Sequence, residues 1–127
     1  MTKFVPDDTI DVLLDKVATA TKMDAVSDVS TPTNLTNSLA SVSMTPGTSG
    51  DFTIAAGDVS GRKVTVAQKA SVSISTSGTA RHIVLTDTSG GSDTIVDITT
   101  CTDQVLSTGG GGTVTFPSWS HEVLDPT

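Results

Sequence analysis

The sequence predicts a mainly β protein of the α+β class, an antiparallel β-sandwich or barrel of about seven strands with one N-terminal amphipathic helix. Serine and threonine supply 39 of the 127 residues, and 13 of the 14 acidic residues are aspartate, a balance that favours strands and turns over helices. An apolar stripe with helical spacing occurs near the N-terminus, and from residue 51 onward short runs alternate with period two. The length fits a single domain over 1–127.

The helix is expected over 6–22. Pro6 and the two aspartates after it offer a cap and an acidic first turn. Apolar side chains then recur at i, i+3, i+4 and i+7, which places them on one helical face: Ile10, Leu13, Leu14 and Val17. This stripe can pack on the protein's own sheet or on a neighbouring subunit, and the sequence favours neither.

Two segments separate the helix from the β-rich body. Residues 23–29 alternate loosely and predict a first strand. Residues 30–50 are rich in Ser, Thr, Asn, Pro and Gly and predict a long polar connection, in which 38–42 has room for a helical turn. Long connections in compact domains are usually functional, and polar segments are often ordered by a partner. We therefore expect 30–50 to contact a partner subunit.

The β-rich body is expected over 51–126. Its short alternating runs are separated by turns at 57–61, 77–78, 88–92 and 109–112. The run that begins at residue 80 is expected to alternate between two faces, with Ala80, His82, Val84 and Thr86 on one face and Arg81, Ile83 and Leu85 on the other.

The charge balance excludes several partners. The net charge is −7, and the densest basic pair is the isolated Arg62–Lys63, so we expect neither nucleic-acid binding nor attraction to an anionic membrane. No apolar run reaches the roughly 18 residues of a membrane span. The first eight residues do not resemble a signal peptide, so we expect the chain to stay in the compartment where it is made. Cys101 is the single cysteine, which excludes an internal disulfide.

No motif predicts an enzyme. The glycine run 109–112 is not followed by the Lys–Ser/Thr of a phosphate-binding loop. His82 and His121 lack the spacing of a metal site, and no Gly-x-Ser-x-Gly elbow singles out a nucleophile. The aspartate pairs do not match an EF-hand, and Cys101 is typical of a buried small hydrophobe. We expect no catalytic residue, no metal and no cofactor.

Four segments resemble a family of small virion structural proteins of tailed bacteriophages. They are DVSGRKVTV at 58–66, GTARHIVL at 78–85, TTCT at 99–102 and FPSW at 116–119. The N-terminal order of helix, short strand and polar segment is similar too, so the resemblance covers nearly the whole chain. One departure is TSGGSDTIVD at 88–97, which is longer and more polar than the family's turn. These motifs mark the family and carry no catalytic residue.

The resemblance implies a non-enzymatic virion protein, assembled in the host cytoplasm. Within the virion we expect a capsid decoration (cement) protein that stabilises the shell, with the major capsid protein or other virion proteins as partners. Symmetric binding at local axes favours a homo-oligomer such as a trimer. The alternative is a component of the neck, tail or fibre. A wall-degrading hydrolase would need paired carboxylates that the spacing does not offer, and a free-standing ligand-binding β module would need an apolar pocket.

The residues expected at interfaces follow from these patterns. The helix stripe would dock the helix. Arg62 and Arg81 can pair with aspartates across strands or subunits. Trp119, the only indole, is expected to anchor the core or an interface. The full set is Ile10, Leu13, Leu14, Val17, Arg62, Arg81 and Trp119.

Overall fold

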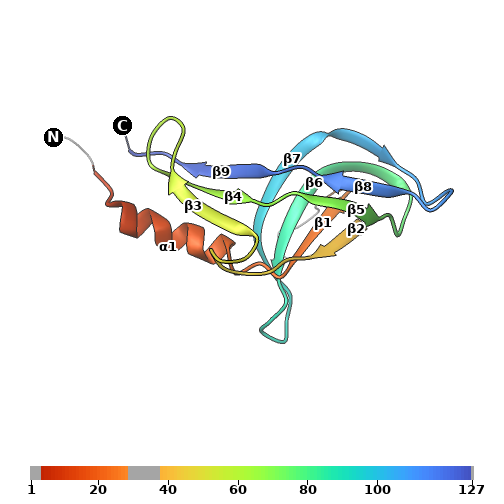
Figure 1. The fold of residues 1–127 in the computed structure, drawn as a ribbon, viewed down its shortest axis with the longest axis horizontal. Coiled ribbons are helices and arrows are strands. Elements are labelled where there is room, and N and C mark those ends of the chain that lie inside the picture. The colour runs from red at the N-terminus through yellow and green to blue at the C-terminus, as the bar shows by residue number, and fades with distance from the viewer. Residues whose placement is uncertain (1–3, 29–37, 127) are drawn as a thin grey trace.

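The computed structural model describes residues 4–28 and 38–126. Within these ranges the chain folds as one N-terminal helix and nine strands, and every strand pair is antiparallel. The predicted mainly β fold is confirmed, with nine strands in place of about seven. Figure 1 shows the helix lying at one end of the molecule and the longest strands curving around the other.

The elements follow one another as α1 (Asp7–Val17), β1 (Lys22–Val26), β2 (Ser38–Ser43), β3 (Phe52–Ala56), β4 (Arg62–Val66), β5 (Lys69–Ser73), β6 (Gly78–Asp87), β7 (Thr94–Leu106), β8 (Thr113–Phe116) and β9 (Trp119–Val123). They form a four-stranded sheet in the order β2-β1-β6-β7, a three-stranded sheet β3-β4-β9 and a two-stranded sheet β5-β8. The sheets pack against one another like the layers of a sandwich, with the apolar core between them.

Helix α1 is shorter than the predicted segment 6–22. The Pro6 carbonyl accepts the backbone N–H of Thr9, which starts the first turn at the expected place. The helix ends at Val17 because the chain then turns to join the sheet, where the Thr21 N–H donates to the Thr86 carbonyl. The last five residues of the predicted helix, 18–22, therefore form this turn and the start of β1.

The predicted connection over 30–50 contains a strand, so that prediction is wrong for its middle. β2 pairs along its length with β1, from Lys22 opposite Ser43 to Val26 opposite Ser38. The suggested helical turn at 38–42 is absent from this stretch for the same reason. Strand pairing satisfies the backbone groups there, which outweighs the turn-like composition. Residues 30–37 lie outside the described residues.

Two of the sheets form one ribbon. β4 pairs with β9 and β5 pairs with β8, and the register continues between them, with Val66 opposite Trp119 and Lys69 opposite Phe116. Pro117 lies at the break, where its missing N–H removes a donor from the ladder. The ribbon is therefore a long two-stranded structure with an interruption in its middle, and β3 adds a third strand beside β4.

The two layers are joined along one side. A bridge pairs Ala40 of β2 with Ile74, and the Leu39 carbonyl accepts the N–H groups of Ser75 and Thr76 at 2.8 and 3.2 Å. On the opposite side, β7 ends the four-stranded sheet, while β8 and β9 each end theirs. The layers are therefore closed at the β2 side and separate at the β7 side.

Candidate functional site

The apolar stripe predicted on the helix consists of three buried residues and one exposed residue. Ile10, Leu14 and Val17 are buried in the core of the protein itself. Leu13 is 60% exposed, and its neighbour Val12 is 67% exposed. The helix thus uses three of its four predicted residues within the protomer, and Leu13 belongs to the outer surface.

Arg62 and Arg81 both pair with aspartates of the same chain. The Arg62 guanidinium donates from Nε to Asp11 Oδ1 at 2.8 Å and from Nη2 to Asp11 Oδ2 at 3.2 Å, which joins β4 to α1. The hydrogen bond to Asp11 raises the pKa of Arg62 further. Arg81 lies 3.5 Å from Asp103 across β6 and β7, and both side chains are more than half exposed. The Arg62 contact therefore fixes the helix, while the Arg81 contact is a weak surface pair.

Trp119 lies at the edge of the core. It is half-buried, packs against the buried cluster, and its Nε1 has no hydrogen-bond partner among the described residues. Phe52, which is fully buried, is the largest fully buried side chain of the described part of the chain. The central anchor is therefore Phe52, and Trp119 closes the cluster from the side of β9.

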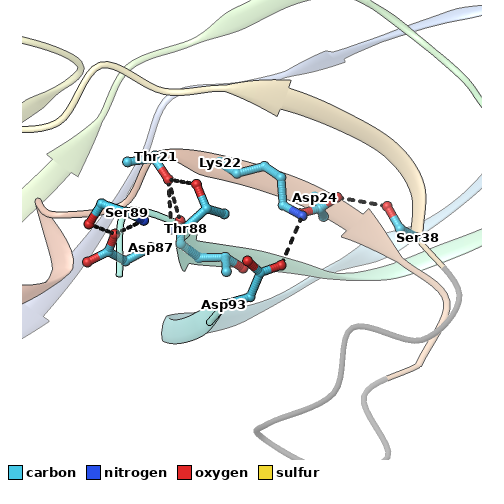
Figure 2. Close-up of polar contacts among 9 residues, drawn as sticks. Thr21, Lys22, Asp24, Ser38, Asp87, Thr88, Ser89 and Asp93 are labelled. Atoms are coloured by element: carbon cyan, nitrogen blue, oxygen red, sulfur yellow. Dashed lines mark hydrogen bonds and ion pairs between the residues drawn. The ribbon is translucent and has the colours of Figure 1, made fainter. Parts of the chain in front are cut away.

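A buried carboxylate lies in the middle of β1, at a position that the sequence analysis did not predict as a site. Asp24 is 1% exposed, and its Oδ1 accepts a 2.8 Å hydrogen bond from the Ser38 hydroxyl at the start of β2. Its Oδ2 lies 3.7 Å from the Lys22 ammonium, which also lies 4.0 Å from Asp93 (Figure 2). Because Lys22 occupies the space between the two carboxylates, this cluster is an ion-pair network rather than a cation site.

A second polar group ties the start of β1 to the end of β6. The Thr21 and Thr88 hydroxyls lie 2.7 Å apart, and the Thr88 N–H donates to Thr21 Oγ1 (Figure 2). Asp87 accepts hydrogen bonds from the hydroxyl and the N–H of Ser89, and these lower the pKa of its carboxyl group. These contacts stabilise the base of the polar turn between β6 and β7.

The two histidines and the cysteine have different surroundings. His121 Nδ1 lies 2.9 Å from Asp97 Oδ2, while the Nδ1 of His82 is buried without a hydrogen-bond partner in the described structure. Burial, followed by the charge of Asp103, raises the pKa of the Cys101 thiol, which keeps it in the poorly nucleophilic neutral form. Residues 4–28 and 38–126 contain no group of three His, Cys, Asp or Glu placed to hold a metal ion.

An apolar pocket opens where the two layers separate. Its volume is about 280 Å³, and its walls come from β6, β7 and β8, with Ile83, Cys101, Leu106, Val114 and Phe116 among the lining residues. Sites for drug-sized ligands usually occupy roughly 300–1,000 Å³. The volume of the pocket therefore lies at the lower end of this range.

Comparisons with protein-family models, curated proteins and solved structures find no significant match to this chain. No helix in the described part of the chain is long and apolar enough to cross a membrane. The functional argument therefore depends on the residues themselves and on the resemblance of the four segments.

Proposed function

We propose that this chain is a non-enzymatic structural protein of a tailed-bacteriophage virion, and within the virion a capsid decoration protein that stabilises the shell. The observation that carries the proposal is the resemblance of 58–66, 78–85, 99–102 and 116–119 to the family. The positions of these segments in the fold add physical support, because they coincide with places where the fold restricts the choice of residue.

The first and last segments show this restriction. Gly61 in the β3–β4 turn has a φ of +66°, and a Cβ there would collide with the Val123 carbonyl of β9. Phe116 is 2% exposed, and Pro117 follows it at the break of the ribbon. A resemblance at such positions supports a shared scaffold with the phage proteins.

The second and third segments meet in the four-stranded sheet. The segment 78–85 forms most of β6, which is buried on both faces from Ile83 to Thr86. The segment 99–102 lies in β7 beside the irregularity that separates the pair Ala80–Gln104 from the pair His82–Thr100. Both segments therefore contribute to the shape of the sheet.

The mechanism of a decoration protein is the addition of buried interface between neighbouring capsid subunits. Apolar surface removed from water contributes about 25 cal/mol per Å². The protein offers exposed apolar side chains for such contacts at Phe4, Val12, Leu13, Val59 and Leu124. Many copies on one shell would together oppose the outward pressure of the packaged genome.

Sedimentation with undecorated shells of the phage that carries this protein tests the proposal. The oligomeric state of the purified protein is first measured by light scattering, which also tests the expected trimer. Saturable co-sedimentation of many copies per shell is the expected result. Absence of binding, together with a low copy number in virions, would contradict the decoration role and indicate the neck, tail or fibre.

A further inference from the structure

One end of the molecule gathers exposed apolar side chains from three separate segments. Phe4 precedes α1 and is 76% exposed, Val59 in the β3–β4 turn is 80% exposed, and Leu124 after β9 is 52% exposed. Figure 1 shows the start of the helix, the β3–β4 turn and the C-terminal end of the described chain at the same end of the molecule. We call this surface, together with the carboxylates carried by the same three segments, the acidic end.

Hydrogen bonds hold the three segments together. The Ser60 hydroxyl accepts the N–H of Asp125, and Glu122 Oε1 accepts the N–H of Val59 at 3.1 Å, so the turn and the C-terminal segment are adjacent. Arg62 follows the turn and binds Asp11 of α1, which places the helix beside them. The acidic end is thus a defined surface of the folded chain.

Carboxylates lie close to these apolar residues along the chain. The acids of the acidic end are Asp7, Asp8, Asp11, Asp58, Glu122 and Asp125, and the described bases among them are Arg62 and Lys63. Arg62 is held by Asp11 and Lys63 by Asp58. Asp7 and Asp8 also lie close enough to Arg62 for their charges to act on it. Both bases are neutralised by carboxylates of the same surface, so the remaining four carboxylates give it an excess of negative charge.

We propose that the acidic end docks on a different protein whose surface carries arginine or lysine side chains around an apolar hollow. This inference rests on the proposed function and names the chemistry of the partner, a basic surface on a capsid subunit or other virion protein. The apolar side chains would enter the hollow, and the carboxylates would pair with the surrounding bases.

The charge of the acidic end argues against a second copy of the chain as its occupant. A two-fold contact places the same patch on both subunits, so two acidic ends would bring like charges together. Like charges facing one another across an interface are unfavourable. The homo-oligomer contact, where there is one, belongs to another surface.

The inference is tested by measuring how strongly matched variants of the chain bind undecorated shells. The test pair is Val59→Ser with Leu124→Ser, and the control is Val105→Ser, a 74% exposed valine near the end of β7. A second pair neutralises charge, with Asp7→Asn and Asp8→Asn against Asp103→Asn, whose side chain is 65% exposed. We expect the test variants to bind shells at least about fivefold more weakly and the controls to bind like the parent chain. Binding should also weaken as the salt is raised above ~0.15 M.

Equal binding by test and control variants would overturn the inference and leave the decoration role standing. If the parent chain does not bind shells, the decoration role fails and a second probe decides the inference separately. That probe is a short peptide of alternating leucine and arginine, titrated into the labelled protein by NMR, with a leucine–glutamate peptide as the control. Shifts confined to 4–11, 58–61 and 122–125 support the inference. Shifts elsewhere, or none, overturn it, as does a dimer that Val59→Ser dissociates in light scattering.

Discussion

His121 of β9 and Asp97 of β7 connect the two layers on the side where their strands do not pair. His121 Nδ1 lies 2.9 Å from Oδ2 and 3.1 Å from Oδ1 of Asp97, and the Asp97 side chain is only 9% exposed. Asp97 Oδ1 also accepts the N–H of Ile98. On this side one side-chain pair therefore joins the layers, whereas on the opposite side the backbone bridge between Ala40 and Ile74 joins them.

Replacing His121 with alanine should lower the free energy of unfolding by about 1–2 kcal/mol, because a nearly buried carboxylate loses its partner. The measurement is urea denaturation of the parent chain, His121→Ala, Asp97→Asn and the double variant. We expect a coupling energy of at least about 0.5 kcal/mol in this cycle. Additive effects would show that the two residues do not depend on each other.

Leu14 and Leu13 give a matched test of the helix. Leu14 is 1% exposed in the core and Leu13 is 60% exposed. Leu14→Ala should lower the stability by about 2–5 kcal/mol through loss of burial and the cavity it leaves. Leu13→Ala should change it by no more than about 0.5 kcal/mol. Thermal and urea unfolding of the two variants measure this difference in stability. Similar losses of stability in both variants would contradict the observed packing.

Asp51 should make stability depend on pH in acid. Burial acts to raise the pKa of Asp51, but the Lys69 ammonium at 2.8 Å and the Thr45 N–H outweigh it, so the pKa is lowered. A carboxyl with a lowered folded pKa stabilises the protein above its unfolded pKa of about 3.9, and this contribution is lost as the pH falls through the folded pKa.

Asp51→Asn should therefore be less stable than the parent chain at pH 7, by about 1 kcal/mol. Urea midpoints measured from neutral pH down to acid should converge only once the pH has fallen below the lowered pKa of the folded carboxyl, where the parent's side chain is uncharged like asparagine. A difference that stays constant over this range would mean that the charge of Asp51 does not stabilise the fold.

Cys101 should react slowly with thiol reagents in the folded protein. Its pKa is raised by burial and by Asp103, and only the thiolate is nucleophilic. The rate of iodoacetamide modification at pH 8 should be several-fold lower than in the urea-unfolded chain, and Asp103→Asn should increase it. Mass spectrometry of the time course measures both rates. A folded-state rate equal to that of the unfolded chain would disprove the shielding.

The sequence predicts elements well where periodicity and burial agree. The helical spacing of Ile10, Leu14 and Val17 identifies their buried face because α1 packs by one face against the strands, chiefly β3 and β4. The same spacing includes Leu13, since an apolar stripe does not reveal how far the opposing surface extends. Leu13 therefore lies at the margin of the contact, and only the packed structure shows this.

Prediction from the sequence fails where the structure of a segment depends on its pairing with neighbouring strands. The composition of β2 is typical of a polar connection, because its pairing with β1 is not encoded in its own residues. The alternation predicts that Ala80 shares a face with Val84, yet Ala80 belongs to the same buried cluster as Ile83 and Leu85, next to an irregularity of the ladder between Ala80 and His82. The burial of Asp24 is equally set by its neighbours on β2 and β6, and its only sequence signal is a charge inside the run Met-Asp-Ala-Val.

The continuous ribbon of β4–β5 and β8–β9 has a consequence for the order of folding. Arg62 pairs with Val123, so its strands are separated by nearly half of the chain, whereas β6 and β7 are joined by a short hairpin. Closing the short loop costs less chain entropy than closing the long one. We expect the β6–β7 hairpin to form first and the ribbon to zip up around it, which makes ribbon closure the slow kinetic step.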